Sequence, residues 1–148
     1  MKKFTVGVII TDGKYLLVGH GTGKPTRQGF DIFKGVVEGK DVDFIDTAVR
    51  ELEEESGIVV SKEDLFFAGK FDYTKKKDLY LYVYRSRNVK KEFDVSKLKC
   101  RSLIENSDKP EIDSYRIISL SKFHIFLYRS LYPIVFKIVH DLKKGISW

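Results

Sequence analysis

The segment from residue 43 to residue 57, DFIDTAVRELEEESG, has the clearest helix pattern in the chain. Asp43 is a good N-cap residue, and Gly57 stands where a left-handed residue commonly ends a helix. Apolar side chains recur at the spacing of one helix face, at Ile45, Ala48, Val49 and Leu52. A helix with one apolar stripe packs on a core, so the other segments must supply a surface that it covers.

Three glutamates near the end of this helix share one side of it. Glu51, Glu54 and Glu55 are related as i, i+3 and i+4, which places their carboxylates about a quarter-turn from the apolar stripe. Like charges at this spacing destabilise a helix by roughly 0.2–0.5 kcal/mol per pair, and the negative end of the helix dipole adds to the cost. A hard cation such as Mg²⁺ or Mn²⁺ would remove it. The helix alone leaves two interpretations open, a solvated acidic face and a metal site.

Segments rich in β-branched and aromatic residues lie on both sides of the helix and predict strands. Residues 4–11 and 15–20 are separated by Asp-Gly-Lys, and Asp-Gly favours the tight turn of a hairpin. Further strands are expected in the segments 30–39, 65–74, 79–87, 97–105 and 108–123. Strands around a mid-chain helix, with a second helix at the end, predict one α/β (α+β) domain over residues 1–148, with a mixed sheet covered by helices.

The apolar segment 123–142, FHIFLYRSLYPIVFKIVHDL, raises the question of a membrane span. Charged residues interrupt it, so we expect a packed amphipathic helix that Pro133 kinks or divides in two. The N-terminal segment lacks the uninterrupted apolar stretch of a signal peptide, and the single cysteine, Cys100, excludes a disulfide within the chain. We therefore expect a cytoplasmic protein without membrane contact, and no segment points to a required protein partner.

The segment GVVEGKDVDFIDTAVRELEEESGI resembles the signature of the Nudix hydrolase family, G-x5-E-x7-R-E-U-x-E-E-x-G-U, where U is aliphatic. Gly35 matches the first glycine, and the residues from Arg50 to Ile58 match the whole second half. Asp41 stands where the family has glutamate, and eight residues instead of seven separate it from Arg50. Because the helical half is intact, we place the extra residue in the loop before the helix.

Flanking segments resemble the diadenosine polyphosphate and RNA 5′-pyrophosphohydrolase branch of that family. FDIFKG resembles its W-D-x-P-K-G segment, FDYTKKKD resembles a stretch with a base-stacking tyrosine and phosphate-facing lysines, and KPEIDSYRIISLSKF resembles a late P-E-x-x-x-Y-R segment. The resemblance implies a helix–sheet–helix sandwich with a mixed central sheet. It also implies substrate-binding roles for Lys34, Tyr73, Lys75, Lys77 and Tyr115. The two tyrosines have an alternative interpretation as structural aromatics of the sheet or its rim.

The same resemblance implies a divalent-metal site and its catalytic groups. The ligands would be the Gly35 carbonyl and the carboxylates of Glu51, Glu54 and Glu55, with Mg²⁺ or Mn²⁺ as the cofactor. Glu54 or Glu111 would take the proton from the attacking water, and the sequence does not choose between them. Arg50 lies one turn before Glu54 and would orient it.

The reaction implied is hydrolysis of a nucleoside diphosphate linked to another group, above all a dinucleoside polyphosphate such as diadenosine tetraphosphate. ADP-ribose, FAD and RNA 5′ ends are further candidates, and the net charge of +6 suits polyanionic ligands. Two other interpretations stay open. One is a catalytically inactive Nudix-fold module that senses a nucleotide, which the altered Asp41 favours. The other is a structural acidic helix in an RNA-binding protein. His20 is expected to be a solvated loop residue.

Overall fold

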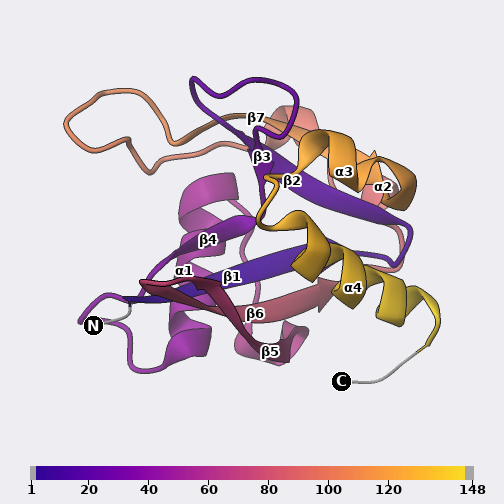
Figure 1. Ribbon diagram of the computed structural model, residues 1–148. Helices are drawn as coiled ribbons and strands as arrows, with labels where there is room; N and C mark the ends of the chain where they lie inside the picture. Colours follow the sequence, from indigo (N-terminus) through magenta and orange to yellow (C-terminus); the bar gives the residue numbers. More distant parts are fainter. Residues whose placement is uncertain (1–2, 146–148) are drawn as a thin grey trace.

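A computed structural model describes residues 3–145, so the ends of the domain expected over 1–148 lie outside the described residues. Helices cover both faces of a mixed sheet, with α1 behind the sheet and α4 in front of it in Figure 1. The strands are β1 (Lys3–Thr11), β2 (Tyr15–Gly21), β3 (Phe30–Asp31), β4 (Phe33–Val36), β5 (Leu65–Thr74), β6 (Lys77–Arg85) and β7 (Ile112–Ser119). The helices are α1 (Phe44–Ser56), α2 (Val89–Glu92), α3 (Phe123–Phe126) and α4 (Tyr132–Lys143). Short 3-10 turns span Lys62–Asp64, Val95–Lys97 and Leu120–Lys122.

The strand order within the described residues is β3-β2-β1-β6-β5, with β4 paired to β1 and β7 to β2. β1 and β6 run parallel, whereas the other pairs are antiparallel, so the sheet is mixed as predicted. β1 and β2 form the predicted hairpin but pair only near the turn, where Ile10 faces Leu17. Farther from the turn, β4 pairs with β1 instead and passes beneath α1.

Two apolar clusters fill the spaces between the sheet and the helices. Neighbouring residues of β1 point to opposite faces, so Val8 packs under α1 and Ile9 packs under α4. Ala48 and Leu52 of the predicted stripe are fully buried in the first cluster. Burial of a leucine side chain contributes about 1.5–3 kcal/mol, so this stripe holds α1 on the sheet. The helix–sheet–helix sandwich is therefore confirmed.

Helix α1 begins and ends where the sequence predicts. Asp43 accepts a hydrogen bond from the Asp46 N–H, and the Asp46 carboxylate accepts one from the Asp43 N–H at 3.0 Å. This reciprocal pair is a capping box, which satisfies amide groups at the start of the helix. Gly57 has a φ of 79°, and its N–H bonds to the Glu53 carbonyl. Glycine adopts this left-handed conformation at little cost, because it has no Cβ atom.

The prediction of a strand over residues 97–105 is wrong. The structure describes this whole segment and forms none of the named strands there. The Lys99 N–H bonds to the Ser56 carbonyl at 3.1 Å, and the Arg101 N–H bonds to the Glu54 carbonyl at 2.8 Å. These carbonyls lack partners within α1 because they belong to its last turn. The segment therefore caps a helix end instead of joining a sheet.

The C-terminal helical segment is divided in two, one of the two outcomes expected from Pro133. The proline lies in the first turn of α4, where its missing N–H costs no helical hydrogen bond. Val135 and Val139 on this helix are fully buried against the sheet. Within residues 3–145, no helix combines the length and the apolar character needed to cross a bilayer.

Candidate active site

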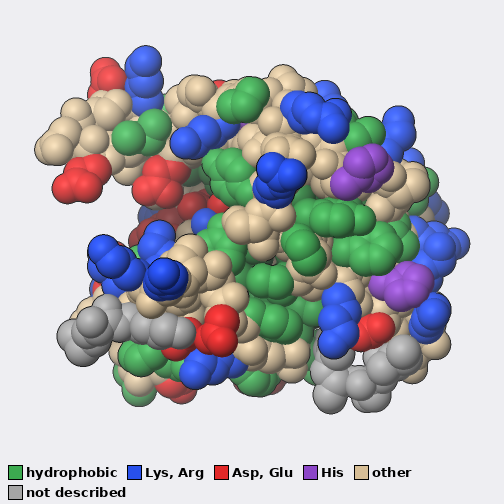
Figure 2. Space-filling model, in the orientation of Figure 1, with side chains coloured by type: hydrophobic (Ala, Val, Ile, Leu, Met, Phe, Trp, Pro, Cys, Tyr) green, Lys and Arg blue, Asp and Glu red, His purple; other side chains and the backbone are tan. Residues whose placement is uncertain are grey.

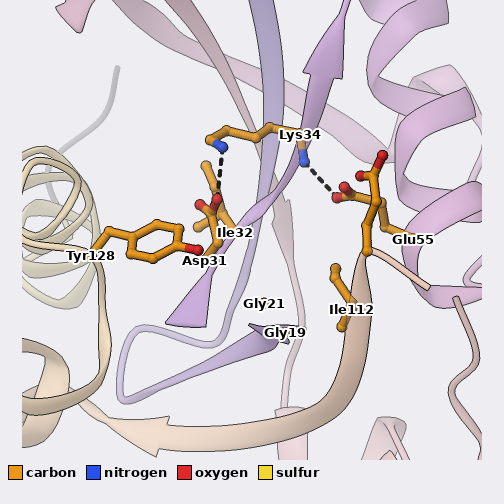
Figure 3. A pocket seen from close by; sticks show the side chains of 9 residues that line it. Gly19, Gly21, Asp31, Ile32, Lys34, Glu55, Ile112 and Tyr128 are labelled. Atoms are coloured by element: carbon orange, nitrogen blue, oxygen red, sulfur yellow. Dashed lines mark hydrogen bonds and ion pairs between the residues drawn. The ribbon is translucent and has the colours of Figure 1, made fainter. Parts of the chain in front are cut away.

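A polar pocket of about 190 Å³ lies between the last turns of α1 and the strands β2, β3, β4 and β7. Glu51 and Glu55 belong to the helix side of this region and are only 9% and 6% exposed. Figure 3 shows the pocket from close by, with Glu55 on one side and Tyr128 on the other. We call it the inner pocket, and its lining residues are Gly19, Gly21, Asp31, Ile32, Lys34, Glu55, Glu111, Ile112 and Tyr128.

Gly35 on β4 brings the main chain of that strand directly against the carboxylate of Glu51. A Cβ atom added at Gly35 would lie 2.1 Å from the carboxyl carbon of Glu51 and 2.2 Å from one of its oxygens. Real Cβ atoms do not approach other heavy atoms this closely, so a side chain at residue 35 would displace the carboxylate. The predicted pair of Gly35 and Glu51 is therefore brought together.

Lys34 connects two acidic residues across the inner pocket (Figure 3). Its backbone N–H donates to Oε1 of Glu55 at 2.9 Å, and its ammonium pairs with Oδ2 of Asp31 at 2.6 Å. Burial lowers the pKa of Lys34, but the Asp31 carboxylate outweighs this effect and raises it, so the lysine stays charged. Asp31 was not predicted as a site residue. The sequence contained a usable signal, because Asp31 stands three residues before Lys34 and next to the aromatic Phe30.

Burial opposes the ionisation of two acids beside the inner pocket, and neighbouring acids add to this effect. Burial raises the pKa of Glu51 to about 7 against the opposing effect of Arg50, and Glu54 and Glu111 add to the rise. Burial also raises the pKa of Glu55 well above its usual value. Unlike a solvated helix face, these side chains are withdrawn from water while their neighbours are also acidic.

Arg50 is the centre of an ion-pair network that includes Asp41. Nε and a terminal nitrogen of Arg50 bond to the two oxygens of Asp41 at 3.0 and 2.8 Å. Another terminal nitrogen bonds to Glu51 at 2.8 Å and to Glu54 at 3.2 Å. Asp41 lies in the loop before α1, and the placement of the extra residue in that loop stays a prediction. The shorter acid still binds the arginine at two points.

We expect Asp41→Asn to lower the free energy of unfolding by about 2–3 kcal/mol, because it removes a charged acceptor that is 4% exposed. Arg50 holds the pKa of Asp41 far below its usual range, and Thr47 also donates to this carboxylate at 2.8 Å. Thermal denaturation should show a midpoint about 5–10 °C lower. Asp108→Asn, on the exposed 102–110 loop, is the matched control. Equal midpoints for both variants would contradict the structural role of Asp41.

The residues around Glu51 and Glu55 fit a hard divalent cation. They offer carboxylate oxygens, and Oδ1 of Asp31 is buried without a hydrogen-bond partner among residues 3–145. Raised carboxyl pKa values and the glycine cradle at Gly35 also agree with a site that lacks compensating charge. Within the described range, no three acidic, histidine or cysteine side chains converge into a ready-made ligand set. Arg50 pairs with two of the glutamates, Glu51 and Glu54, so a cation would compete with the guanidinium for their oxygens.

Glu111 and Tyr115, the late residues of the predicted site, have different positions. Glu111 lines the inner pocket, close enough to raise the pKa of Glu51. Tyr115 lies outside that lining, packs against Phe33, and donates its hydroxyl hydrogen to the Glu55 carbonyl. It therefore fastens the end of α1 to β7, which agrees with its alternative interpretation as a structural aromatic.

The residues predicted on β5 and its turn are not brought into the inner pocket. The Tyr73 hydroxyl accepts a hydrogen bond from Ser130 at 3.2 Å, and the ring packs against the cluster under α4. Lys75 lies in the turn between β5 and β6, Lys77 is the first residue of β6, and both are exposed. A role of these three residues in substrate binding stays a prediction.

The expectation that His20 is solvated is wrong. Its side chain is 15% exposed and lies between an acid and the loop that follows β2. Nδ1 is 2.7 Å from Asp113, and Nε2 is 2.9 Å from the Lys24 carbonyl. His20 therefore ties the glycine-rich loop to β7, beside the inner pocket.

Comparison with known proteins agrees with this geometry. A family model described as the NUDIX domain matches residues 1–142. The chain belongs to the Nudix family. As a Nudix hydrolase it is an enzyme of the pyrophosphatase type. It is 33% identical over 145 residues to the "uncharacterized 17.7 kDa protein in e-segB intergenic region" of Enterobacteria phage T4, across 91% of this chain and 94% of that relative.

Several solved structures have the same fold at low sequence identity. The NUDIX domain of Shewanella oneidensis NrtR, complexed with ADP ribose, has a TM-score of 0.69 and 10% identity, over 96% of this chain and 88% of that one. A MutT/nudix family protein from Enterococcus faecalis has a TM-score of 0.66 and 14% identity, over 93% and 61%. A bifunctional NMN adenylyltransferase/ADP ribose pyrophosphatase from Francisella tularensis, complexed with AMP and a manganese ion, has a TM-score of 0.65 and 16% identity, over 95% and 42%.

These matches support only the coarser part of the resemblance. They support the Nudix family, but they give no support to the diadenosine polyphosphate and RNA 5′-pyrophosphohydrolase branch. The chain spans less than two thirds of the Enterococcus and Francisella proteins, whose additional parts it does not match. The comparisons therefore do not identify the substrate of this chain.

Proposed function

We propose that this Nudix hydrolase uses a divalent cation near the end of α1 to hydrolyse the pyrophosphate linkage of a nucleoside diphosphate joined to another group. The observation that carries the proposal is the pair of buried glutamates, Glu51 and Glu55, whose pKa values burial raises, so that a cation beside them would favour their ionised forms. Gly35 lets one carboxylate lie against the main chain, and Glu54 stands beside both. Such an arrangement costs stability unless a cation or a substrate-bound cation offsets it.

Each residue of the site has a role in this reaction. When bound, a divalent cation supplies charge neutralisation for the pyrophosphate and a lowered pKa for the attacking water. Glu54 is 25% exposed, and its Oε2 bonds to Arg50, which orients Oε1 to take a proton. Glu111, in the wall of the inner pocket, is the alternative base. The Lys34 ammonium lies in the same pocket, where it can bind a phosphate oxygen as a point charge.

A dinucleoside polyphosphate such as diadenosine tetraphosphate is the substrate that we place first, with ADP-ribose, FAD and RNA 5′ ends as the other candidates. The inner pocket, at about 190 Å³, is smaller than the usual pocket for a whole ligand of this kind, which is about 300–1,000 Å³. It therefore suits phosphate groups, while the nucleosides lie outside it. Two of the similar structures contain ADP ribose or AMP, which supports a substrate with an adenosine nucleotide portion.

A substrate panel tests the proposal. We expect diadenosine tetraphosphate, ADP-ribose, FAD or triphosphorylated RNA to be hydrolysed with Mg²⁺ or Mn²⁺ and to be stable with EDTA, as measured by chromatography of the products. Hydrolysis that continues in EDTA would contradict the metal requirement. Binding of these nucleotides without any hydrolysis would instead support the second candidate, a nucleotide-sensing module. The ion pairs of Arg50 with Glu51 and Glu54 favour this candidate, because they occupy carboxylates that a metal would need.

A further inference from the structure

A second pocket, of about 380 Å³, lies beside Glu54 and is lined by Lys40, Glu54, Arg101 and Ser102. We call it the outer pocket. Figure 2 shows a hollow at the left of the molecule, beneath the loop that projects at the upper left of Figure 1. Acidic side chains gather in its depth, and basic side chains gather on the opposite lip, at the end of the β5–β6 hairpin (Figures 1 and 2). The outer pocket has two further cations, Lys40 and Arg101, in the same lining as the candidate catalytic carboxylate of Glu54.

The two pockets have neighbouring lining residues in the last turn of α1. Glu54 lines the outer pocket and its neighbour Glu55 lines the inner one. On the facing wall, Glu111 of the inner pocket donates its N–H to the carbonyl of Ser102, in the outer pocket, at 2.9 Å. Residues of the same two segments therefore line both pockets.

The main chain of Arg101 is fixed relative to the carboxylates. Its N–H donates to the Glu54 carbonyl at 2.8 Å, so the backbone of Arg101 moves with the end of α1. The guanidinium forms an exposed ion pair with Glu53, at 3.4 Å. Exposed pairs of this kind are worth about 0–1 kcal/mol, so a phosphate can recruit this guanidinium at small cost.

Lys40 approaches the same pocket from the loop before α1. Its ammonium is exposed and lies 3.4 Å from Glu38, again a weak surface pair. Because Lys40 and Arg101 come from segments far apart in the sequence, the fold places two available cations around one hollow. Two positive groups beside an acidic site attract a ligand that remains anionic beyond the atoms held by the carboxylates.

We propose that Lys40 and Arg101 form a subsite for the phosphate groups that follow the scissile linkage. This inference rests on the proposed function and specifies its substrate class as a chain of three or more phosphates, such as a dinucleoside tetraphosphate. ADP-ribose gains little from the subsite, because a neutral ribose follows its pyrophosphate. The two cations therefore select for the length of the phosphate chain.

The test compares the double variant Lys40→Gln/Arg101→Gln with Lys122→Gln/Lys137→Gln, which removes the same charge from exposed lysines near α3 and on α4. For diadenosine tetraphosphate we expect the first variant to raise KM by about tenfold or more and to leave kcat within about twofold. KM for ADP-ribose should change by less than about twofold in both variants. An equal rise in KM for the two substrates, or a rise of the same size in the control, would overturn the subsite.

A binding measurement separates this inference from the proposed function. Calorimetric titration with a methylene-bridged analogue of diadenosine tetraphosphate needs no turnover. About tenfold weaker binding to Lys40→Gln/Arg101→Gln, with unchanged binding of ADP-ribose, would uphold the subsite even if the wild-type protein hydrolysed nothing. Hydrolysis by the wild-type protein, together with unchanged binding of the analogue by the variant, would uphold the function and refute the subsite.

Discussion

Replacing Glu54 by glutamine lowers kcat for pyrophosphate hydrolysis by about 10³-fold or more and leaves the fold intact. Glutamine has nearly the same shape, but it cannot take a proton and is a weaker ligand for a hard cation. Glu54 is partly exposed, and its hydrogen bond to Arg50 is 3.2 Å long. The shortest bonds of Arg50 to Asp41 and to Glu51 are both 2.8 Å, so Glu54 is the most weakly held of the three acids. Its loss should therefore change the free energy of unfolding by less than about 1 kcal/mol.

Steady-state kinetics and thermal denaturation, measured on the same preparations, check this result. Glu63→Gln removes the same charge from an exposed glutamate in the 3-10 turn Lys62–Asp64 and should leave both measurements unchanged. Full turnover in Glu54→Gln would remove this glutamate from catalysis. Glu111→Gln would then be the variant expected to lose activity.

Replacing Gly35 by alanine should lower kcat/KM by about 10²-fold. We expect this effect to act through Glu51 and not through a contact of residue 35 with the nucleoside. The added Cβ would lie 2.1 Å from the carboxyl carbon of Glu51, so the carboxylate has to move. Because the atoms that clash belong to the end of a side chain, the fold can adapt, and we expect a stability loss below about 2 kcal/mol. A displacement of about 1 Å is enough to cost a catalytic group about 10²-fold in rate.

Gly39→Ala is a matched control from the loop between β4 and α1. A Cβ at Gly39 meets nothing within 4 Å among the described residues, so this variant should keep wild-type activity. Loss of activity in both variants would indicate that the loop backbone needs glycine for another reason. Wild-type kcat/KM in Gly35→Ala would show that the position of the Glu51 carboxylate does not matter for the reaction.

Local features of the site could be predicted from the sequence because they depend on residues close together along the chain. The spacing of Glu51, Glu54 and Glu55 determines their common side of α1, and Asp43 with Gly57 determines where that helix begins and ends. The pattern of strands was also sufficient to predict a mixed sheet between helices. These features follow from helix geometry, capping and alternation.

The remaining features depend on contacts between distant segments. The sequence does not show that β4 joins β1 after the hairpin diverges, and this pairing is what places Gly35 against Glu51. Likewise, no local pattern shows that the Arg101 N–H caps α1, which is why its segment was predicted to be a strand. Tyr115 reads equally well as a stacking or a structural aromatic until its bond to the end of α1 is seen.

Titration with Mn²⁺, followed by electron paramagnetic resonance of the free ion, tests most directly whether the acidic end of α1 holds a divalent cation. We expect the wild-type protein to remove free Mn²⁺ from solution, and Gly35→Ala and Glu54→Gln to bind it at least about tenfold more weakly. Equal binding by all three proteins, or no binding at millimolar Mn²⁺ with or without nucleotide, would contradict a metal site at Glu51, Glu54 and Glu55.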